Sequence, residues 1–243
     1  MRRRLMQLYH LMFHHFGPRG WWPGRGPFEV IVGAILTQNT AWRNVAKAIS
    51  NLRATRVLSP ARLRALPRER LEEQIRPAGY FRVKAKRLRH FLTWLENRHG
   101  GNVTRMFRQD SAGLRRELLA ISGIGPETAD SILLYAGGHA WFVVDAYTKR
   151  ILIRHGLLQP DATYAETQTL FMGHLPQDVQ LYNEYHALLV AVGKTYCRPR
   201  DPRCTECPLM PDLKAHGLTA PLPLDSAHPA RGRGVRRRRG PAP

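Results

Sequence analysis

Apolar residues repeat at the spacing of an α-helix wherever this sequence shows a pattern. Leu5, Leu8, Tyr9 and Met12 follow one another at i, i+3, i+4 and i+7, and residues 28–35 repeat that spacing. Positions three and four apart lie on one face of a helix, so each set can cover a hydrophobic core. Only residues 141–144 look extended, and this run is too short for a sheet. The sequence therefore predicts an all-α fold.

Helix start and stop signals mark further helices. The stretch 82–99 keeps its apolar period and stops at Gly100 and Gly101, which are typical of a helix C-terminus. Ser59 and Pro60 have the residue types that begin a helix. The remaining predicted helices cover residues 110–120, 126–136, 146–155 and 179–192.

The chain is strongly basic. It carries 38 Lys and Arg against 18 Asp and Glu, which gives a formal net charge of +20 in 243 residues. This excess indicates a polyanionic partner, and nucleic acid is the leading candidate. From about residue 216 the composition shifts to Pro, Gly, Ala and Arg without periodicity, so residues 216–243 are predicted to be a disordered basic tail.

Membrane and secreted classes fit the sequence poorly. No apolar run approaches the roughly 18 residues of a membrane span, and the basic N-terminus is not followed by a signal-peptide pattern. Cys197, Cys204 and Cys207 are the only cysteines, an odd number within eleven residues, which suits a metal site better than disulfides. We therefore expect a cytoplasmic protein without membrane contact.

Residues 121–130 read Ile-Ser-Gly-Ile-Gly-Pro-Glu-Thr-Ala-Asp and lie between two predicted helices. Gly123 and Gly125 flank Ile124, and glycine lets a turn adopt positive φ and approach a ligand closely. The free N–H groups at the start of the next helix can then bind a phosphate. A plain turn between helices is the alternative, but the longer string in a basic helical chain favours a helix-hairpin-helix motif that binds DNA.

With three further segments, this motif resembles the endonuclease III superfamily of helix-hairpin-helix DNA glycosylases over residues 5–213. Residues 35–40 resemble the segment whose glutamine enters the gap left by a flipped base, which implies that role for Gln38. Residues 143–150 resemble the segment with the catalytic aspartate, which implies that role for Asp145. The cysteine spacing resembles the family's iron–sulfur loop.

The resemblance implies two helical lobes with the DNA cleft between them. We expect a six-helix lobe over residues 25–136 that contains the hairpin 121–130. The other lobe joins residues 1–24 to residues 137–215 and ends in a cysteine loop, residues 197–213. The expected partner is damaged double-stranded DNA, bound by a monomer with its lesion at the junction of the lobes.

Asp145 has a chemical role and a structural role open to it. Hydrolysis of an N-glycosidic bond builds positive charge on the sugar, and a carboxylate beside C1′ stabilises that charge. Asp145 also precedes a predicted helix, so it can cap that helix, and both roles can hold together.

Glu127 marks a departure from part of the family. Members that also cleave the strand carry a lysine two positions after the second hairpin glycine, where this chain has Glu127. A carboxylate cannot form an imine, so the resemblance predicts a monofunctional enzyme without strong AP lyase activity. The structural alternative is an acid that simply stabilises the first turn of its helix.

Four residues near the N-terminal end supply flat or rigid rings: Trp21, Trp22, Pro23 and Trp42. A positively charged alkylated purine stacks on indole faces by cation–π attraction, although tryptophans are more often core residues. With Glu127 and Lys194, these residues resemble the 3-methyladenine DNA glycosylase III branch. The likeness implies that the rings surround the extruded base and that Glu127 and Lys194 line its edge. That branch can carry a carbamylated lysine, and Lys194 is the candidate, with an ordinary surface lysine after a helix-ending glycine as the alternative.

The cysteine loop leaves three readings open. The spacing Cys197-x6-Cys204-x2-Cys207 matches the family's loop, but Leu213 stands where a fourth cysteine normally follows. The loop can hold a [4Fe-4S] cluster with an incomplete Cys set, completed by Asp212, His216 or an outside ligand. It can bind zinc with one added His or Asp, or it can carry free thiols. Any metal here would be structural.

Three functions follow from these observations. The leading one is a monofunctional glycosylase of base excision repair that removes alkylated purines such as 3-methyladenine. The second is an endonuclease III-like glycosylase and AP lyase that acts on oxidised pyrimidines or abasic sites. The third is a non-catalytic DNA-binding protein that recognises damage or structure.

Overall fold

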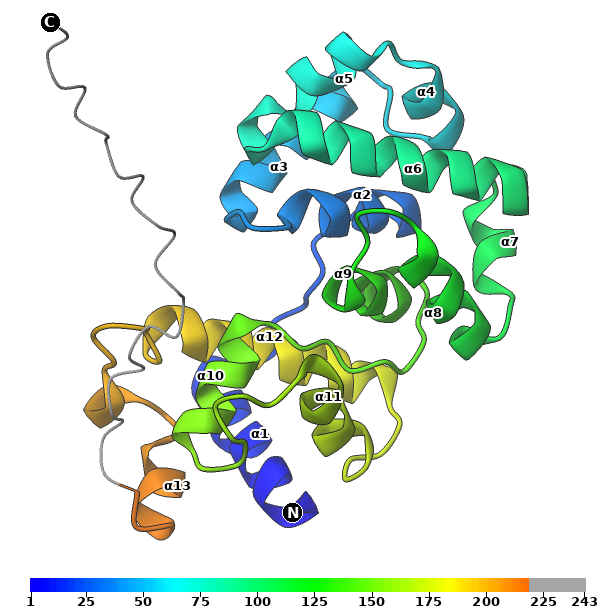
Figure 1. The fold of residues 1–243 in the computed structure, drawn as a ribbon. Helices are drawn as coiled ribbons and strands as arrows, with labels where there is room; N and C mark the ends of the chain where they lie inside the picture. Colours follow the sequence, from blue (N-terminus) through cyan, green and yellow to red (C-terminus); the bar gives the residue numbers. More distant parts are fainter. Residues whose placement is uncertain (219–243) are drawn as a thin grey trace, which may run out of the picture.

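The computed structural model describes residues 1–218, and within them every regular element is helical (Figure 1). Thirteen α-helices and three short 3-10 or π-helical turns follow one another, and this described part contains no β-strand. The predicted all-α fold is confirmed. Most of the predicted tail, residues 219–243, lies outside the described range. None of the described helices combines the length and apolar character needed to cross a membrane.

Eight α-helices surround a first hydrophobic core, in the upper part of Figure 1. They are α2 (Pro27–Thr37), α3 (Trp42–Ala54), α4 (Pro60–Ala65), α5 (Arg68–Ile75), α6 (Phe81–His99), α7 (Val103–Phe107), α8 (Ser111–Ala120) and α9 (Pro126–Ser131). The 3-10 turn η1 (Arg76–Ala78) joins α5 to the segment before α6. The expectation of six helices is too low, because α5 and α7 have only eight and five residues and show no full apolar period.

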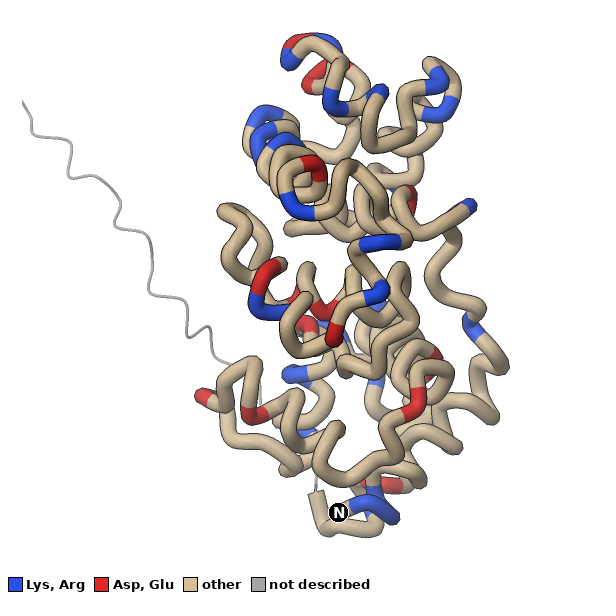
Figure 2. The backbone as a smooth tube through the Cα atoms, turned by 90° about the vertical axis from the view of Figure 1, so that its right-hand side faces the viewer, with Lys and Arg blue, Asp and Glu red and all other residues tan. Residues whose placement is uncertain are grey.

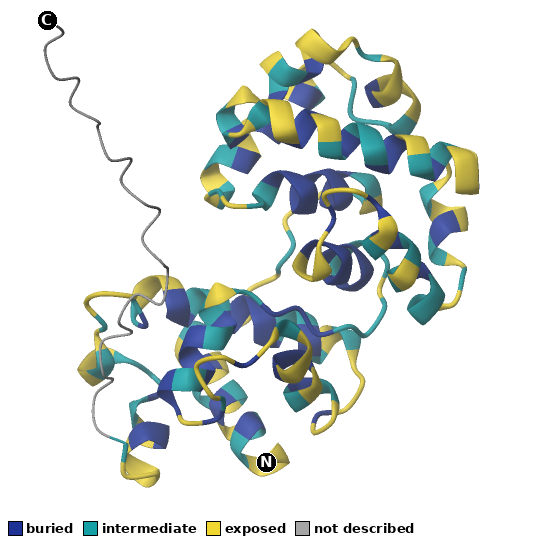
Figure 3. Cartoon of the chain, in the orientation of Figure 1, coloured by how far each residue is buried: buried dark blue, intermediate teal, exposed yellow. Residues whose placement is uncertain are grey.

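Five α-helices surround a second core, in the lower part of Figure 1: α1 (Arg2–Phe16), α10 (Ala146–Arg154), α11 (Tyr164–Met172), α12 (Val179–Thr195) and α13 (Met210–Ala215). The central helix is α12, which packs against both α1 and α10. Tyr185 on α12 donates a hydrogen bond to the carbonyl of Leu5 at 2.8 Å, which fixes α1 to this core. Figure 3 shows that the buried residues of both groups of helices face inward.

A π-helical turn, η2 (Ile132–Ala136), passes from one core to the other. Ile132 and Leu133 belong to the first core, whereas Leu134 belongs to the second. A π-turn contains one residue more than an α-helical turn, so it rotates the side chains that follow it. The chain therefore changes cores within one continuous helical segment.

Several helices begin at side-chain caps. Asn102, Asp110, Asp145, Thr163 and Asp178 each accept a hydrogen bond from the backbone N–H three residues later. Each cap satisfies one of the free N–H groups of the first turn and stabilises its helix by about 1 kcal/mol. These caps account for the sharp starts of α7, α8, α10, α11 and α12.

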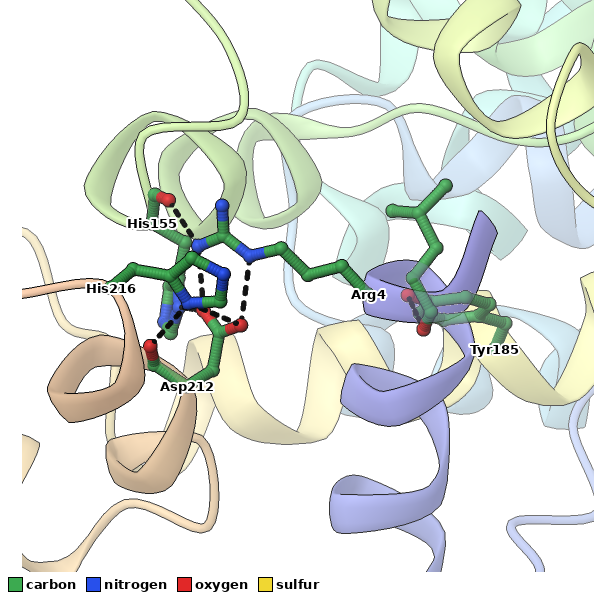
Figure 4. Close-up of polar contacts among 6 residues, drawn as sticks. Arg4, His155, Tyr185, Asp212 and His216 are labelled. Carbon is green, nitrogen blue, oxygen red and sulfur yellow. Dashed lines mark hydrogen bonds and ion pairs between the residues drawn. The ribbon is translucent and has the colours of Figure 1, made fainter. Parts of the chain in front are cut away.

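A buried ionic cluster fastens the C-terminal helix α13 to α1 (Figure 4). Arg4 contacts both carboxylate oxygens of Asp212 at 2.8 Å and donates to the carbonyl of His155 at 2.6 Å. The Nδ1 atom of His155 lies 2.6 Å from Oδ2 of Asp212. Burial alone would raise the pKa of Asp212, but the hydrogen bonds from Arg4 and His155 hold that pKa well below its usual range. Asp212 is therefore a buried anion held by Arg4 and His155, and Nδ1 of His216 lies 3.4 Å from its Oδ1.

We predict that Asp212→Asn lowers the free energy of unfolding by about 3 kcal/mol, because it leaves the Arg4 guanidinium without its counter-ion. Chemical denaturation followed by circular dichroism measures this change. Glu73→Gln is the matched control, since Glu73 pairs with Arg70 on an exposed helix face and such pairs contribute little. Equal stability of the two variants would contradict the structural role of Asp212.

Candidate active site

The hairpin between α8 and α9 depends on a glycine at position 123. Gly123 has φ +93°, and a Cβ added there would lie 2.4 Å from Cγ of Arg87. Ile124 is buried and donates its backbone N–H to the carbonyl of Ile121 at 3.0 Å. Gly125 differs, because a Cβ there would meet nothing within 4 Å. The turn is thus packed against α6 at Gly123 and open at Gly125.

Gln38 follows α2 and lies directly against this hairpin. Its Nε2 donates to the carbonyl of Gly123 at 3.0 Å and to Oγ1 of Thr128 at 2.9 Å, and its Oε1 accepts from Arg87. Gln38 and Arg87 line an open cleft of about 630 Å³ together with residues 123–128 and Tyr164. The structure therefore brings Gln38, the hairpin glycines and Glu127 to one surface.

The buried Lys84 supports the segment that carries Gln38. Its Nζ donates to the carbonyls of Leu36 and Ala78, each at 2.8 Å. Burial, with a smaller effect of the Arg87 charge, lowers the pKa of Lys84 to about 8. This lysine satisfies a free carbonyl at the end of α2, just before the turn at Gln38.

We predict that Gly123→Ala lowers the free energy of unfolding by about 2 kcal/mol, because the new Cβ is strained at positive φ and collides with Arg87. Gly125→Ala is the matched control, with φ −94° and open space around the added carbon. Thermal or chemical unfolding of both variants checks this prediction. It fails if the two substitutions cost the same.

Asp145 is held at the N-terminus of α10. Its Oδ1 accepts from the backbone N–H of Thr148 at 2.7 Å and from the Thr148 hydroxyl at 2.9 Å. Its Oδ2 lies 3.5 Å from Nε2 of His186, and 11% of its side chain is exposed. Burial by itself would raise the pKa of Asp145, but His186 and the Thr148 donors hold that pKa below its usual value. The helix cap thus occupies one oxygen and leaves the other turned toward His186.

A second carboxyl, that of Glu127, lies in the same electrostatic environment. Glu127 is in the first turn of α9 and lines the open cleft. Although it is exposed there, the protein around it and the charge of Asp145 raise the pKa of Glu127 to about 7. Two carboxyls with separated pKa values are a frequent feature of sites that handle protons.

The three predicted tryptophans form one aromatic cluster. The ring centroids of Trp21, Trp22 and Trp42 lie 5.0, 5.1 and 5.2 Å apart, and all three contacts are tilted or edge-on. Trp22 lies over Gly33 of α2, where a Cβ would come within 3.1 Å of the indole nitrogen. Pro23 follows the cluster and is exposed.

Tyr135 and His186 connect this aromatic cluster to Asp145. The ring centroids of Tyr135 and Trp22 lie 5.3 Å apart. The Tyr135 hydroxyl lies 2.5 Å from Nδ1 of His186, whose Nε2 faces Asp145. Sequence reasoning missed Tyr135 and His186, because a tyrosine and a histidine on apolar helix faces look like ordinary core residues. It also missed Arg87 and Lys84, which look like solvent-exposed charges of α6.

No hydrogen bond or ion pair among residues 1–218 joins Lys194 to this site. It is exposed near the end of α12. The expectation that Gly193 ends the helix is wrong, because α12 continues to Thr195. Gly193 is buried inside the helix, where a Cβ would lie 2.4 Å from the ring of Tyr147. Glycine is needed here for close packing of α10 on α12, and a helix stop is not its purpose.

The three cysteines border a small apolar pocket of about 20 Å³, which Leu213 also lines. Among residues 1–218, no group of three or more His, Cys, Asp or Glu side chains is placed to hold a metal ion. Asp212 already pairs with Arg4 and His155, and burial raises the pKa of Cys207 to about 12. These residues do not fit a cluster or a zinc ion as they stand. An iron–sulfur cluster in this loop stays a prediction that the side-chain positions do not favour.

Positive charge is concentrated on the helices that follow the tryptophan cluster. Residues 42–99, which span α3 to α6, contain 15 Lys and Arg against 4 Asp and Glu. Figure 2 shows these basic positions along the lobe that contains the hairpin. A basic surface beside a glycine hairpin has the charge and the backbone donors that a DNA strand requires.

The sequence profile of the HhH-GPD superfamily of base excision DNA repair proteins matches residues 32–177, which include the hairpin and Asp145. The chain belongs to this superfamily. A Methanocaldococcus jannaschii protein named as a DNA repair glycosylase is 43% identical over 84% of this chain and 93% of its own length. HhH-GPD membership makes the chain a base excision DNA glycosylase with an endonuclease III-like fold.

Two solved structures of superfamily members are similar to this HhH-GPD chain. An endonuclease III bound non-covalently to DNA matches with a TM-score of 0.74 at 24% identity, over 89% of this chain and 99% of the other. A 3-methyladenine DNA glycosylase of H. pylori bound to 1,N6-ethenoadenine matches with a TM-score of 0.70 at 28% identity, over 79% of this chain and 96% of the other. The first shows the shared fold, and the second is also related in sequence.

Proposed function

We propose that this superfamily member is a monofunctional glycosylase that acts as a monomer and removes alkylated purines, such as 3-methyladenine, from damaged double-stranded DNA. One observation carries the proposal: the tryptophan cluster and Asp145 are joined by contacts through Tyr135 and His186. Electron-rich rings favour a cationic base, and a carboxylate favours the positive sugar that the base leaves behind. These contacts support a site in which aromatic rings bind the base and a carboxylate stabilises the sugar.

The reaction begins with extrusion of the damaged nucleotide, because the glycosidic bond cannot be reached inside the stacked duplex. The alkylated purine stacks against the tryptophans while Gln38 occupies the gap and the hairpin binds the strand. The C1′–N bond breaks, and its electron pair neutralises the cationic base. Asp145 stabilises the positive sugar until water adds at C1′ and gives its proton to the carboxylate or to solvent. The products are a free base and an abasic site.

Glu127 fits a monofunctional role. With a pKa of about 7, its carboxyl is protonated in a large share of molecules near neutral pH and can donate a hydrogen bond to the base. It offers no amine, so it cannot form the imine that a lyase step requires. Lys194 at the base edge, and its carbamylation, remain predictions from the family resemblance.

One relative supports a purine lesion as the substrate, and other relatives support a second candidate function. The H. pylori protein was solved with ethenoadenine, which is a modified purine. Endonuclease III proteins also match this chain, for example that of Thermotoga maritima at 30% identity. They favour the alternative of an endonuclease III-like glycosylase and lyase for oxidised pyrimidines or abasic sites.

We predict that Asp145→Asn slows single-turnover release of methylated purines at least about 100-fold, because the positive sugar loses its carboxylate. The measurement is chromatographic identification of the bases released from methylated duplex DNA. Asp178→Asn is the matched control, since Asp178 caps α12 by accepting from the backbone N–H of Leu181 at 2.7 Å, as Asp145 does from Thr148. If wild type releases no base, or if Asp145→Asn is as fast as wild type, the proposed function is wrong.

We predict that borohydride traps no covalent adduct between wild type and a lesion-containing duplex, because residue 127 carries no amine. Glu127→Lys places an amine in the first turn of α9 and should give a trapped species visible by gel electrophoresis. An adduct with wild type would favour the endonuclease III-like alternative and would remove the monofunctional assignment.

A further inference from the structure

We propose that His186, oriented by Tyr135, is a positioning residue that fixes the free oxygen of Asp145 for the reaction. The inference rests on the proposed function, because it assigns a further residue to the same site. It is carried by the arrangement of three side chains from η2, α10 and α12.

The imidazole of His186 has one preferred orientation. His186 is 7% exposed, its Nδ1 lies 2.5 Å from the Tyr135 hydroxyl, and its Nε2 lies 3.5 Å from Oδ2 of Asp145. Within the described chain, Nε2 has no hydrogen-bond partner. Buried polar atoms are almost always paired, so Asp145 is the acceptor toward which this nitrogen is directed. If the tyrosine donates to Nδ1, the ring proton lies on Nε2 and points at Asp145.

Asp145 needs such a partner because its two oxygens have different tasks. Thr148 occupies Oδ1 through two hydrogen bonds, which leaves Oδ2 as the oxygen available to the sugar and water. A donor near Oδ2 restrains rotation of the carboxylate and keeps it ionised in a buried position. His186 supplies this donor without the full neutralising charge of a close lysine or arginine.

The surrounding titratable groups give His186 a clear electrostatic effect. They are Glu127 on α9 and Tyr135 on η2, with Glu184 on α12 acting on Tyr135. Burial, with smaller effects of the charges of Asp145 and Glu184, raises the pKa of Tyr135. In this setting a hydrogen bond from His186 favours the ionised form of Asp145.

Tyr135 links this arrangement to the base-binding surface. Its ring contacts Trp22, and its hydroxyl contacts His186. The π-turn at residues 132–136 gives Tyr135 this direction, and such turns are frequent at functional sites. The residue that borders the aromatic cluster therefore also orients the histidine that faces Asp145.

The test is the pH profile of single-turnover base release from duplex DNA with tritium-labelled methyl groups. His186→Leu removes the donor, and the pKa of Asp145 should rise toward that of an uncompensated buried carboxyl. The acid limb of the profile should then move up by about one pH unit, since a hydrogen bond donated to the ionised carboxylate lowers its pKa and this variant removes it. His186→Gln, which keeps a donor, should restore part of the rate at low pH.

The controls separate the hydroxyl contact from simple loss of packing. Tyr135→Phe keeps the ring against Trp22 and should shift the acid limb in the same direction as His186→Leu, by less. Tyr182→Phe makes the same chemical change on α12, at a buried hydroxyl without a partner among the described residues, and should leave the profile unchanged. Circular dichroism and DNA affinity show whether each variant is folded.

The outcomes distinguish this inference from the proposed function. If wild type releases no methylated base, the proposed function fails and the inference falls with it. If wild type is active and Asp145→Asn is not, the proposed function stands. In that case an unshifted acid limb in folded His186→Leu, or equal effects of Tyr135→Phe and Tyr182→Phe, overturns the role of His186 alone.

Discussion

Two neighbouring residues, Leu133 and Leu134, are fully buried in different hydrophobic cores, and this constraint sets the geometry of the whole molecule. Neither leucine can leave its core without exposing a large apolar side chain, which costs about 2 kcal/mol or more. The helical segment from α9 through η2 is therefore fixed between the lobes. The hairpin lies at one end of this segment and Tyr135 at the other. The hairpin and the candidate active site around Tyr135 are thus held at a constant distance from each other.

The acidic residues divide into two classes by their partners. Asp212, Asp130 and Glu29 are buried and paired with Arg4, Arg115 and Arg53 respectively. Asp145 has no ion pair with a lysine or arginine within residues 1–218, and its contacts are Thr148 and His186. A close guanidinium would neutralise the negative charge that the sugar requires. The chain has a net charge of +20. Because Asp145 forms no ion pair with an arginine among the described residues, its negative charge stays available in this basic protein.

Local patterns in the sequence were sufficient to predict the all-α fold and the hairpin, whereas the gathering of three tryptophans was implied by the family resemblance. Apolar periodicity and glycine spacing depend only on residues that are close in the sequence, so they can be interpreted without knowledge of the fold. Tyr135 and His186 could not be found in this way, because their meaning depends on a contact between residues 51 positions apart. The C-terminal end of α12 was predicted wrongly for a similar reason. Gly193 leaves space for the ring of Tyr147, a residue that is distant in the sequence. The spacing of the three cysteines suggested a metal, and that suggestion stays a prediction, because Leu213 lines the same pocket at the position of the family's fourth cysteine.

The cysteine loop contributes to the site through arginine contacts even without a metal. Arg150 on α10 donates to the carbonyl of Cys197 at 2.7 Å and to that of Gly193 at 3.2 Å. Arg154, one turn later, donates to the carbonyls of Arg198 and Pro199 at 2.6 and 3.0 Å. Buried guanidinium groups that donate to several carbonyls are rigid anchors. They fix α10, which Asp145 caps, against the end of α12, which carries His186. The loop thus sets the register of the two helices whose side chains meet at the reacting carboxylate.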